Sequence, residues 1–181
     1  DPIPLEPAPP PDVQRSADIG MRVFDELNAT MSALTGISTQ SPGVALTYDT
    51  VKQSLPTIET IDTFVSAHPV AVAQLAIQYC DALVEDVGKR ATYFPGFNFD
   101  AVPATALGAS GSAGRTIVLD ALVGRRVDPA LATDPVVGDV RGELNALITR
   151  LSSGQATAAR TQTIVKATCA ALLGSAVTLV Q

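Results

Sequence analysis

Residues 69–86, PVAVAQLAIQYCDALVED, carry the clearest structural pattern in the chain. Their apolar side chains recur at the spacing of one face of an α-helix. The residues on this face are Val72, Leu75, Ala76, Tyr79 and Leu83. Asp81, Glu85 and Asp86 fall outside it. Pro69 suits the first turn of a helix, where a missing N–H costs no hydrogen bond. We therefore predict an amphipathic helix over this stretch.

Helical spacing also governs the sequence on both sides of this stretch. The predicted helices cover residues 16–36, 47–55, 57–65, 69–86, 116–123, 135–154 and 161–180. Thr47 is expected to cap the second of them, and Asp134-Pro135 to begin the sixth. The last one is apolar on most sides and is expected at the centre of the fold. Residues 91–114 form the longest irregular stretch.

The fold class that follows is all-α. No segment alternates polar and apolar residues for long enough to be a strand, and no unit repeats at a fixed period. We expect an irregular bundle of six or seven helices, with a long aromatic-containing loop. Residues 1–15 hold six prolines and are interpreted as an extended arm or linker that resembles a processed end. Residues 16–181 then form a single helical domain of an exported chain.

The composition excludes several classes of protein. Of the 181 residues, 46% are apolar and the net charge is −6, which is far from the profile of a disordered chain. The twelve lysines and arginines are scattered, whereas nucleic acids and anionic membranes select for a basic face. The uncharged, apolar stretch after Lys166 is shorter than the about 20 apolar residues that span a bilayer. We expect neither nucleic acid binding nor a membrane span.

The chain has two cysteines, Cys80 in the 69–86 helix and Cys169 in the last predicted helix. Two cysteines in an exported chain are more often paired than free. A bridge would close a loop of about 90 residues and stabilise the fold by roughly 4 kcal/mol in the chain-entropy model. The alternative is a pair of buried free thiols that act as small apolar residues. Neither cysteine belongs to a C-x-x-C motif, which excludes thioredoxin chemistry and covalent haem attachment.

Other candidate groups have simple interpretations. His68 is the only histidine, and without a recognisable nucleophile or acid partner we expect it to cap a helix or lie on the surface. GASGSAG, residues 108–114, could form an anion nest before Arg115, but it lacks a Walker pattern and is interpreted as a flexible loop. The Asn28 glycosylation motif lies inside a helix and is discounted. We predict no catalytic residues, metal or cofactor; a hydrolase that uses His68 is the least favoured alternative.

Half of the aromatic residues in the chain lie in one short stretch, YFPGFNF. Its aromatic residues are Tyr93, Phe94, Phe97 and Phe99. They surround Pro95-Gly96, a turn pair. The rings either plug the open end of the bundle as a local core or form a contact patch for a partner. Plugging is the favoured interpretation.

Four stretches of the chain resemble one family, the C-terminal region of large secreted bacterial proteins with LamG (concanavalin A-like jellyroll) domains. They are TYDTVKQSLPTIETIDTFVSAH (47–68), VAQLAIQYCDALVED (72–86), YFPGFNF (93–99) and TIVKATCAALLGSAVTLVQ (163–181). The resemblance extends over residues 16–181. It implies an envelope or extracellular setting and lectin-like modules upstream, but no catalytic residues. Because the chain itself has no LamG module, the resemblance implies a C-terminal fragment with a former linker at its start.

These observations predict a non-catalytic structural or assembly module that is extracellular or at the cell surface, with the periplasm as an alternative location. It would be a subunit or scaffold of a surface structure, or the C-terminal domain of an adhesin-like protein. It would bind a protein partner or associate with itself. The alternative is a small-molecule or redox-partner binding module whose pocket lies under the 93–99 loop.

Overall fold

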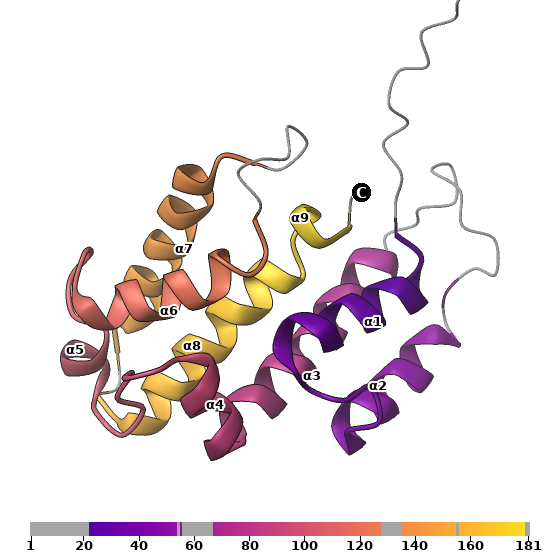
Figure 1. Ribbon diagram of the computed structural model, residues 1–181, viewed down its shortest axis with the longest axis horizontal. Helices are drawn as coiled ribbons and strands as arrows, with labels where there is room; N and C mark the ends of the chain where they lie inside the picture. The colour runs from indigo at the N-terminus through magenta and orange to yellow at the C-terminus, as the bar shows by residue number, and fades with distance from the viewer. Residues whose placement is uncertain (1–21, 54, 56–66, 128–134, 155, 180–181) are drawn as a thin grey trace, which may run out of the picture.

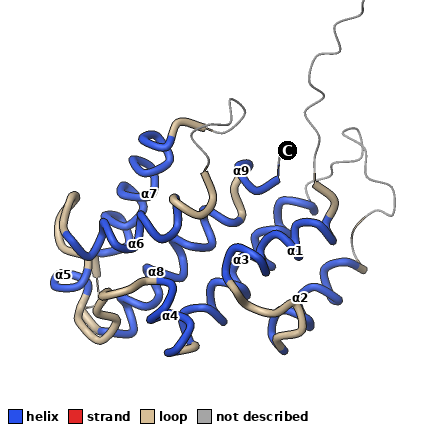
Figure 2. Tube along the Cα trace, in the orientation of Figure 1, coloured by secondary structure: helices blue, strands red, loops and turns tan. Residues whose placement is uncertain are grey.

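The computed structural model describes residues 22–53, 55, 67–127, 135–154 and 156–179. Within these ranges all regular structure is helical, as Figure 2 shows. The helices are α1 (Phe24–Thr35), α2 (Pro42–Lys52), α3 (Ala67–Glu85), α4 (Val87–Tyr93), α5 (Pro103–Ala106), α6 (Ala113–Val123), α7 (Val137–Ser152), α8 (Ala158–Leu173) and α9 (Ala176–Leu179). Seven of the nine helices in these ranges have seven or more residues, which confirms the predicted bundle of six or seven helices.

Two central helices, α3 and α8, organise the molecule. They make the most extensive contact between any two of these helices. α1, α2 and α4 pack on α3, whereas α5, α6, α7 and α9 pack on α8. The described chain therefore forms two groups of helices, one around each central helix, and Figure 1 shows α1 and α2 beside α3, and α6 and α7 beside α8. None of the described helices is long and apolar enough to cross a bilayer.

Local capping explains where several helices begin and end. Gly36, in the left-handed conformation with φ 70°, ends α1, as the sequence predicted. The Asp86 side chain accepts the N–H of Lys89 at 2.9 Å and so begins α4. The Thr157 hydroxyl accepts the N–H of Arg160 at 3.1 Å and begins α8.

Other helix ends differ from the predictions. α2 begins at Pro42 and not after Thr47, because a proline is well suited to the first turn of a helix. Pro135 precedes α7 and is not its first residue, since the N-cap is Val136. The helix predicted over 161–180 stops at Gly174, and the short α9 follows.

Residues 91–114, which were predicted to be irregular, are partly helical in the structure. They contain the end of α4, all of α5 and the start of α6. These pieces are short, so the 3.6-residue period has little length in which to appear. The predicted helix over 57–65 and the start of the one at 16–36 lie outside the described residues.

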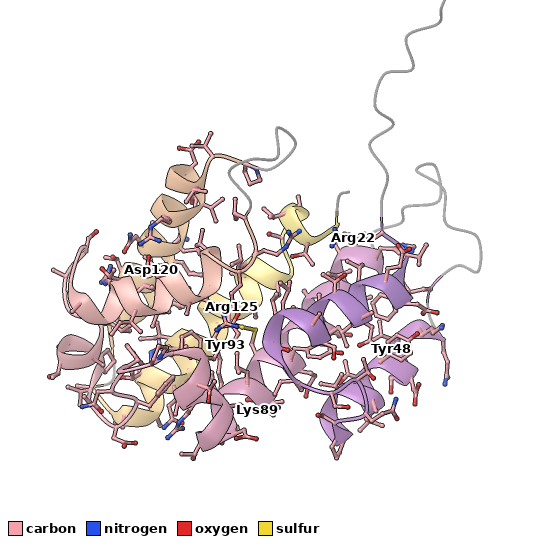
Figure 3. The ribbon with its side chains drawn as sticks, viewed as in Figure 1. Arg22, Tyr48, Lys89, Tyr93, Asp120 and Arg125 are labelled. Carbon is pink, nitrogen blue, oxygen red and sulfur yellow. A yellow bond between two sulfur atoms is a disulfide. The ribbon has the colours of Figure 1, made fainter. Side chains whose placement is uncertain are left out.

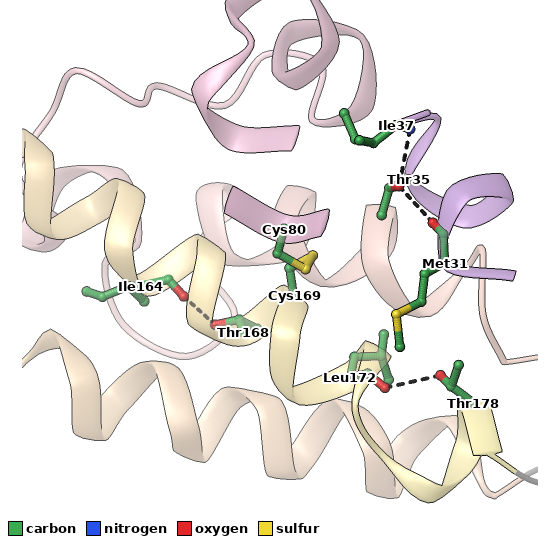
Figure 4. The surroundings of a disulfide bond; sticks show 9 residues. All are labelled: Met31, Thr35, Ile37, Cys80, Ile164, Thr168, Cys169, Leu172 and Thr178. Carbon is green, nitrogen blue, oxygen red and sulfur yellow. Dashed lines mark hydrogen bonds between the residues drawn. A yellow bond between two sulfur atoms is a disulfide. The ribbon is translucent and has the colours of Figure 1, made fainter. Parts of the chain in front are cut away.

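The disulfide Cys80–Cys169 joins α3 to α8, which confirms the predicted bridge. The two Cα atoms are 5.8 Å apart, and neither residue is exposed to solvent. Figure 4 shows the bond between the two helices, with Met31 of α1 and Thr168 of α8 nearby. Both of these neighbours are fully buried. The bridge therefore lies inside the core.

Two further contacts hold α3 against α8. Lys166 of α8 pairs with Asp81 at 2.7 Å and with Glu85, both on α3. Beyond the other side of the disulfide, a methyl group at Gly174 would lie only 3.6 Å from the Cα of Ala73. The small residues there let the backbones of the two elements approach closely.

Tyr79 connects α3 to α1 inside the core. Its hydroxyl lies 2.6 Å from Oδ1 and 3.0 Å from the backbone oxygen of Asn28, and it donates to this pair of acceptors. Burial raises the pKa of Tyr79 to about 12. Asn28 is 9% exposed, so its amide faces the core and is not accessible to a glycosylation enzyme.

Replacing both Cys80 and Cys169 with alanine should lower the free energy of unfolding by about 4 kcal/mol. The reason is that the unfolded chain regains the freedom of a loop whose ends are 89 residues apart. Denaturant titrations with and without a reductant measure the effect. The reductant should destabilise the natural chain and leave the double variant unchanged. Equal midpoints for the oxidised, reduced and double-alanine proteins would contradict the bridge.

Stability should fall at alkaline pH because of Tyr79. Its pKa is raised from 10.0 to about 12 in the folded chain, so the unfolded chain releases this proton first. The stabilisation is fully present below the unfolded pKa and is lost as the pH rises through the folded one. Tyr79→Phe should weaken this dependence, and at neutral pH it should cost about 1 to 2 kcal/mol because Asn28 loses its donor. Unfolding free energies at about pH 8 and about pH 11 test this; an equal decrease in both proteins would count against it.

Candidate functional site

The described residues contain no group of three or more histidine, cysteine, aspartate or glutamate side chains placed to hold a metal ion. His68, the single histidine, is 9% exposed in the first turn of α3. Of the two expected roles of this residue, a surface position is wrong, because α3 turns it toward the interior, and a capping role stays a prediction. Among the described residues, features that could serve a function include the aromatic stretch, cavities between helices and the exposed faces of the helices.

The aromatic rings of the YFPGFNF stretch are buried. Tyr93 is 7% exposed, Phe94 1%, Phe97 8% and Phe99 5%. The ring centroids of Phe94 and Phe99 are 5.8 Å apart and those of Phe97 and Phe99 4.7 Å, both in the edge-on arrangement that aromatic pairs favour. The guanidinium of Arg90 lies 4.9 Å from the ring centre of Phe99. The rings form a local core, which leaves little of their area for a partner.

The backbone holds these rings in place at two points. Gly96 has φ 81°, a conformation that favours glycine, and the N–H of Phe97 donates to the oxygen of Phe94 at 3.1 Å. Further along, the hydroxyl of Thr161 in α8 donates to the oxygen of Ala101 at 2.7 Å. The chain just after the aromatic stretch is therefore hydrogen-bonded to the first turn of α8.

A cavity of about 310 Å³ lies between α1, α4 and the turn that follows α6. α1 and the residue after it contribute residues 33–36, and α4 contributes Gly88, Lys89, Thr92 and Tyr93. Arg125 comes from the turn after α6. This cavity, named here the Lys89–Arg125 cavity, meets the aromatic stretch at Tyr93, and no phenylalanine lines it.

Two cationic side chains and no acidic one line the Lys89–Arg125 cavity. Lys89 Nζ donates to the oxygen of Gly36 at 2.7 Å, at the C-terminal end of α1, where a helix favours positive charge. The guanidinium carbon of Arg125 lies 4.3 Å from the ring centre of Tyr93, a cation–π contact. Figure 3 shows these three side chains close together. Burial raises the pKa of Tyr93, and the charge of Arg125 opposes that shift.

A second cavity, of about 470 Å³, lies between α7, α8 and α9. Its aliphatic lining residues are Val140, Leu144, Leu147, Leu172 and Val177. Asp139, Glu143 and Arg150 also line it. Most of its wall is apolar, so it offers few polar groups to orient a ligand.

The glycine-rich stretch 108–114 does not present Arg115 as an anion-binding group. Arg115 is 4% exposed, and its Nη1 donates to the hydroxyl of Thr149 at 2.7 Å and to the oxygen of Asn145 at 3.3 Å, both in α7. Burial lowers the pKa of this guanidinium. The stretch is also tightly packed where α6 begins, because a methyl group at Gly114 would meet the oxygen of Ala106 at 1.7 Å. Arg115 therefore serves the packing of α6 on α7.

Sequence reasoning did not single out Lys89 or Arg125. They lie far apart in the chain, and neither belongs to a motif. Only the packing of α4 against the end of α1 and the turn after α6 brings them to one cavity. No family model, curated protein or solved structure matches this chain.

Gly114→Ala should destabilise the protein, although alanine is the better helix former. The new methyl group would lie 1.7 Å from the backbone oxygen of Ala106, and separating α6 from α5 should cost roughly 2 kcal/mol or more. Gly142→Ala in α7 is the matched control, because nothing lies within 4 Å of its methyl group. That change should stabilise by up to about 1 kcal/mol. Thermal unfolding compares the two, and shifts of the same sign would refute the close contact.

Proposed function

We propose that this chain is a non-catalytic assembly module that acts outside the cytoplasm and associates with a second copy of itself. The observation that carries the proposal is the outer face of α3. Val70 and Ile77 lie two turns apart on this face and are 57% and 53% exposed. Exposed apolar side chains mark a contact surface where they gather on one face, and these two share one face of α3.

The part of α3 that carries Val70 and Ile77 is also free of charge up to Asp81, which lies one turn beyond Ile77. From Pro69 to Cys80 the helix contains no acidic or basic residue. Leu46 of the flanking helix α2 is 70% exposed. α2 is close at this point, because a methyl group at Gly43 would lie 2.9 Å from Oε1 of Gln78. Leu46 is thus an exposed aliphatic side chain on the helix that flanks α3.

This absence of charge favours a second copy as the partner. The chain has a net charge of −6, so two copies repel each other over most of their surfaces. Two copies can approach each other along an uncharged strip without that repulsion. In a two-fold arrangement with α3 antiparallel to itself, Val70 of one copy would face Ile77 of the second copy. Such a contact closes on itself and gives a dimer.

The setting outside the cytoplasm has two supports. A buried disulfide forms and persists in oxidising compartments. The resemblance to the C-terminal region of secreted LamG proteins agrees with such a compartment. In that setting the module would be a subunit or scaffold of a surface structure, or the C-terminal domain of an adhesin-like protein.

Light scattering behind size-exclusion chromatography, over a wide range of concentrations, tests the association. The mass of the natural chain should rise toward that of a dimer. Ile77→Lys should weaken the dimer by about tenfold or more, because it places a charge in an apolar contact. The matched control is Val136→Lys, since Val136 is 68% exposed but lies before α7. A natural chain that stays at 18.7 kDa at every concentration would refute the proposal, and so would equal effects of the two lysines.

A further inference from the structure

We propose that the Lys89–Arg125 cavity binds a small organic carboxylate with a flat, apolar body. The cavity brings two cationic groups together and has no acidic side chain in its lining. This is notable in a chain in which acidic residues outnumber basic ones by 18 to 12. The site lies outside the self-association surface, because the outer face of α3 contributes nothing to its lining.

The size of the cavity limits the ligand. Its volume is about 310 Å³, at the small end of the roughly 300 to 1,000 Å³ of ligand pockets. At about 30 Å³ for each water molecule, this corresponds to roughly ten water-sized groups. A single ring with a carboxylate is of this size, whereas a nucleotide or an oligosaccharide would extend beyond the cavity.

The two cations have hydrogen-bonding capacity left for an anion. Lys89 donates one hydrogen bond, to Gly36, and an ammonium group has three donors. The guanidinium carbon of Arg125 lies 4.3 Å from the ring centre of Tyr93. A guanidinium carries five N–H donors in a fork that matches the two oxygens of a carboxylate.

The two threonine hydroxyls of the lining are already engaged. The hydroxyl of Thr35 donates to the oxygen of Met31 at 2.7 Å, and that of Thr92 donates to the oxygen of Gly88 at 3.0 Å. These hydroxyls are poorly placed to recognise a neutral sugar or polyol. Leu34 and the buried ring of Tyr93 supply apolar wall. Charge recognition beside an apolar wall favours an organic carboxylate over inorganic phosphate.

Benzoate and its neutral analogue benzamide form a matched pair of probes. Each is titrated into the ¹⁵N-labelled chain while amide chemical shifts are recorded. Benzoate should shift the amides of Gly36, Gly88 and Tyr93, with a dissociation constant on the order of millimolar, as expected for a small ligand in an open site. Benzamide should shift them much less, because it carries no charge for Lys89 and Arg125.

Variants assign the effect to the cavity. Arg125→Gln should weaken benzoate binding about tenfold, since it removes a charge-assisted pair of hydrogen bonds. Arg150→Gln on α7 is the control, because it removes the same charge from an exposed position outside this cavity. It should leave the titration unchanged, and unchanged spectra of both variants without ligand show that the fold is kept.

Four results would overturn the inference. They are equal shifts with benzamide and benzoate, no loss of benzoate binding in Arg125→Gln, an equal loss in Arg150→Gln, and equal saturation of the same amides by inorganic phosphate. The last would assign a general anion site and not a carboxylate site. The comparison of benzoate with benzamide uses only the natural chain, so it holds even if a variant fails to fold. Neither probe tests self-association, which makes failure of this inference distinguishable from failure of the proposed dimer.

Discussion

The contact between α3 and α8 is the constraint on which the rest of this structure depends. Each of these helices has its own group of shorter helices packed on it. The two groups bury their apolar faces against each other along this contact. The Cys80–Cys169 bond closes it covalently, and the ion pairs of Lys166 lie beside it. The chain thereby gains one continuous core from two small ones.

The proposed self-association face of α3 and the Lys89–Arg125 cavity both result from the packing of α3 on α8. α3 directs Tyr79 and Cys80 into the core, so its opposite side, with Val70 and Ile77, remains available outside. The Lys89–Arg125 cavity lies where the two groups of helices meet, since Lys89 belongs to the α3 group and Arg125 follows a helix of the α8 group. A ligand in this cavity would therefore touch both groups.

The sequence predicted the features that depend on long periodic patterns. The helix over 69–86 was predicted within two residues at its start and one at its end, because apolar side chains recur along five turns of it. α4 was missed because it is only seven residues long. The break at Gly174 was missed because a glycine inside an apolar run costs about 1 kcal/mol, which a helix often tolerates. The cavity was beyond prediction, since Lys89 and Arg125 meet only through packing.

The disulfide also determines how the chain would carry a mechanical load. A pull applied before α3 and after α8 passes from one helix to the other through the bond between Cys80 and Cys169. The 89-residue separation of the cysteines places α4 to α7 outside this line of tension. At about 3.3 to 3.6 Å for each residue, this loop corresponds to roughly 300 Å of extended chain, which cannot be pulled out while the bond is intact. The oxidation state of one bond thus decides whether this module is a short, stiff connection or a long, extensible one.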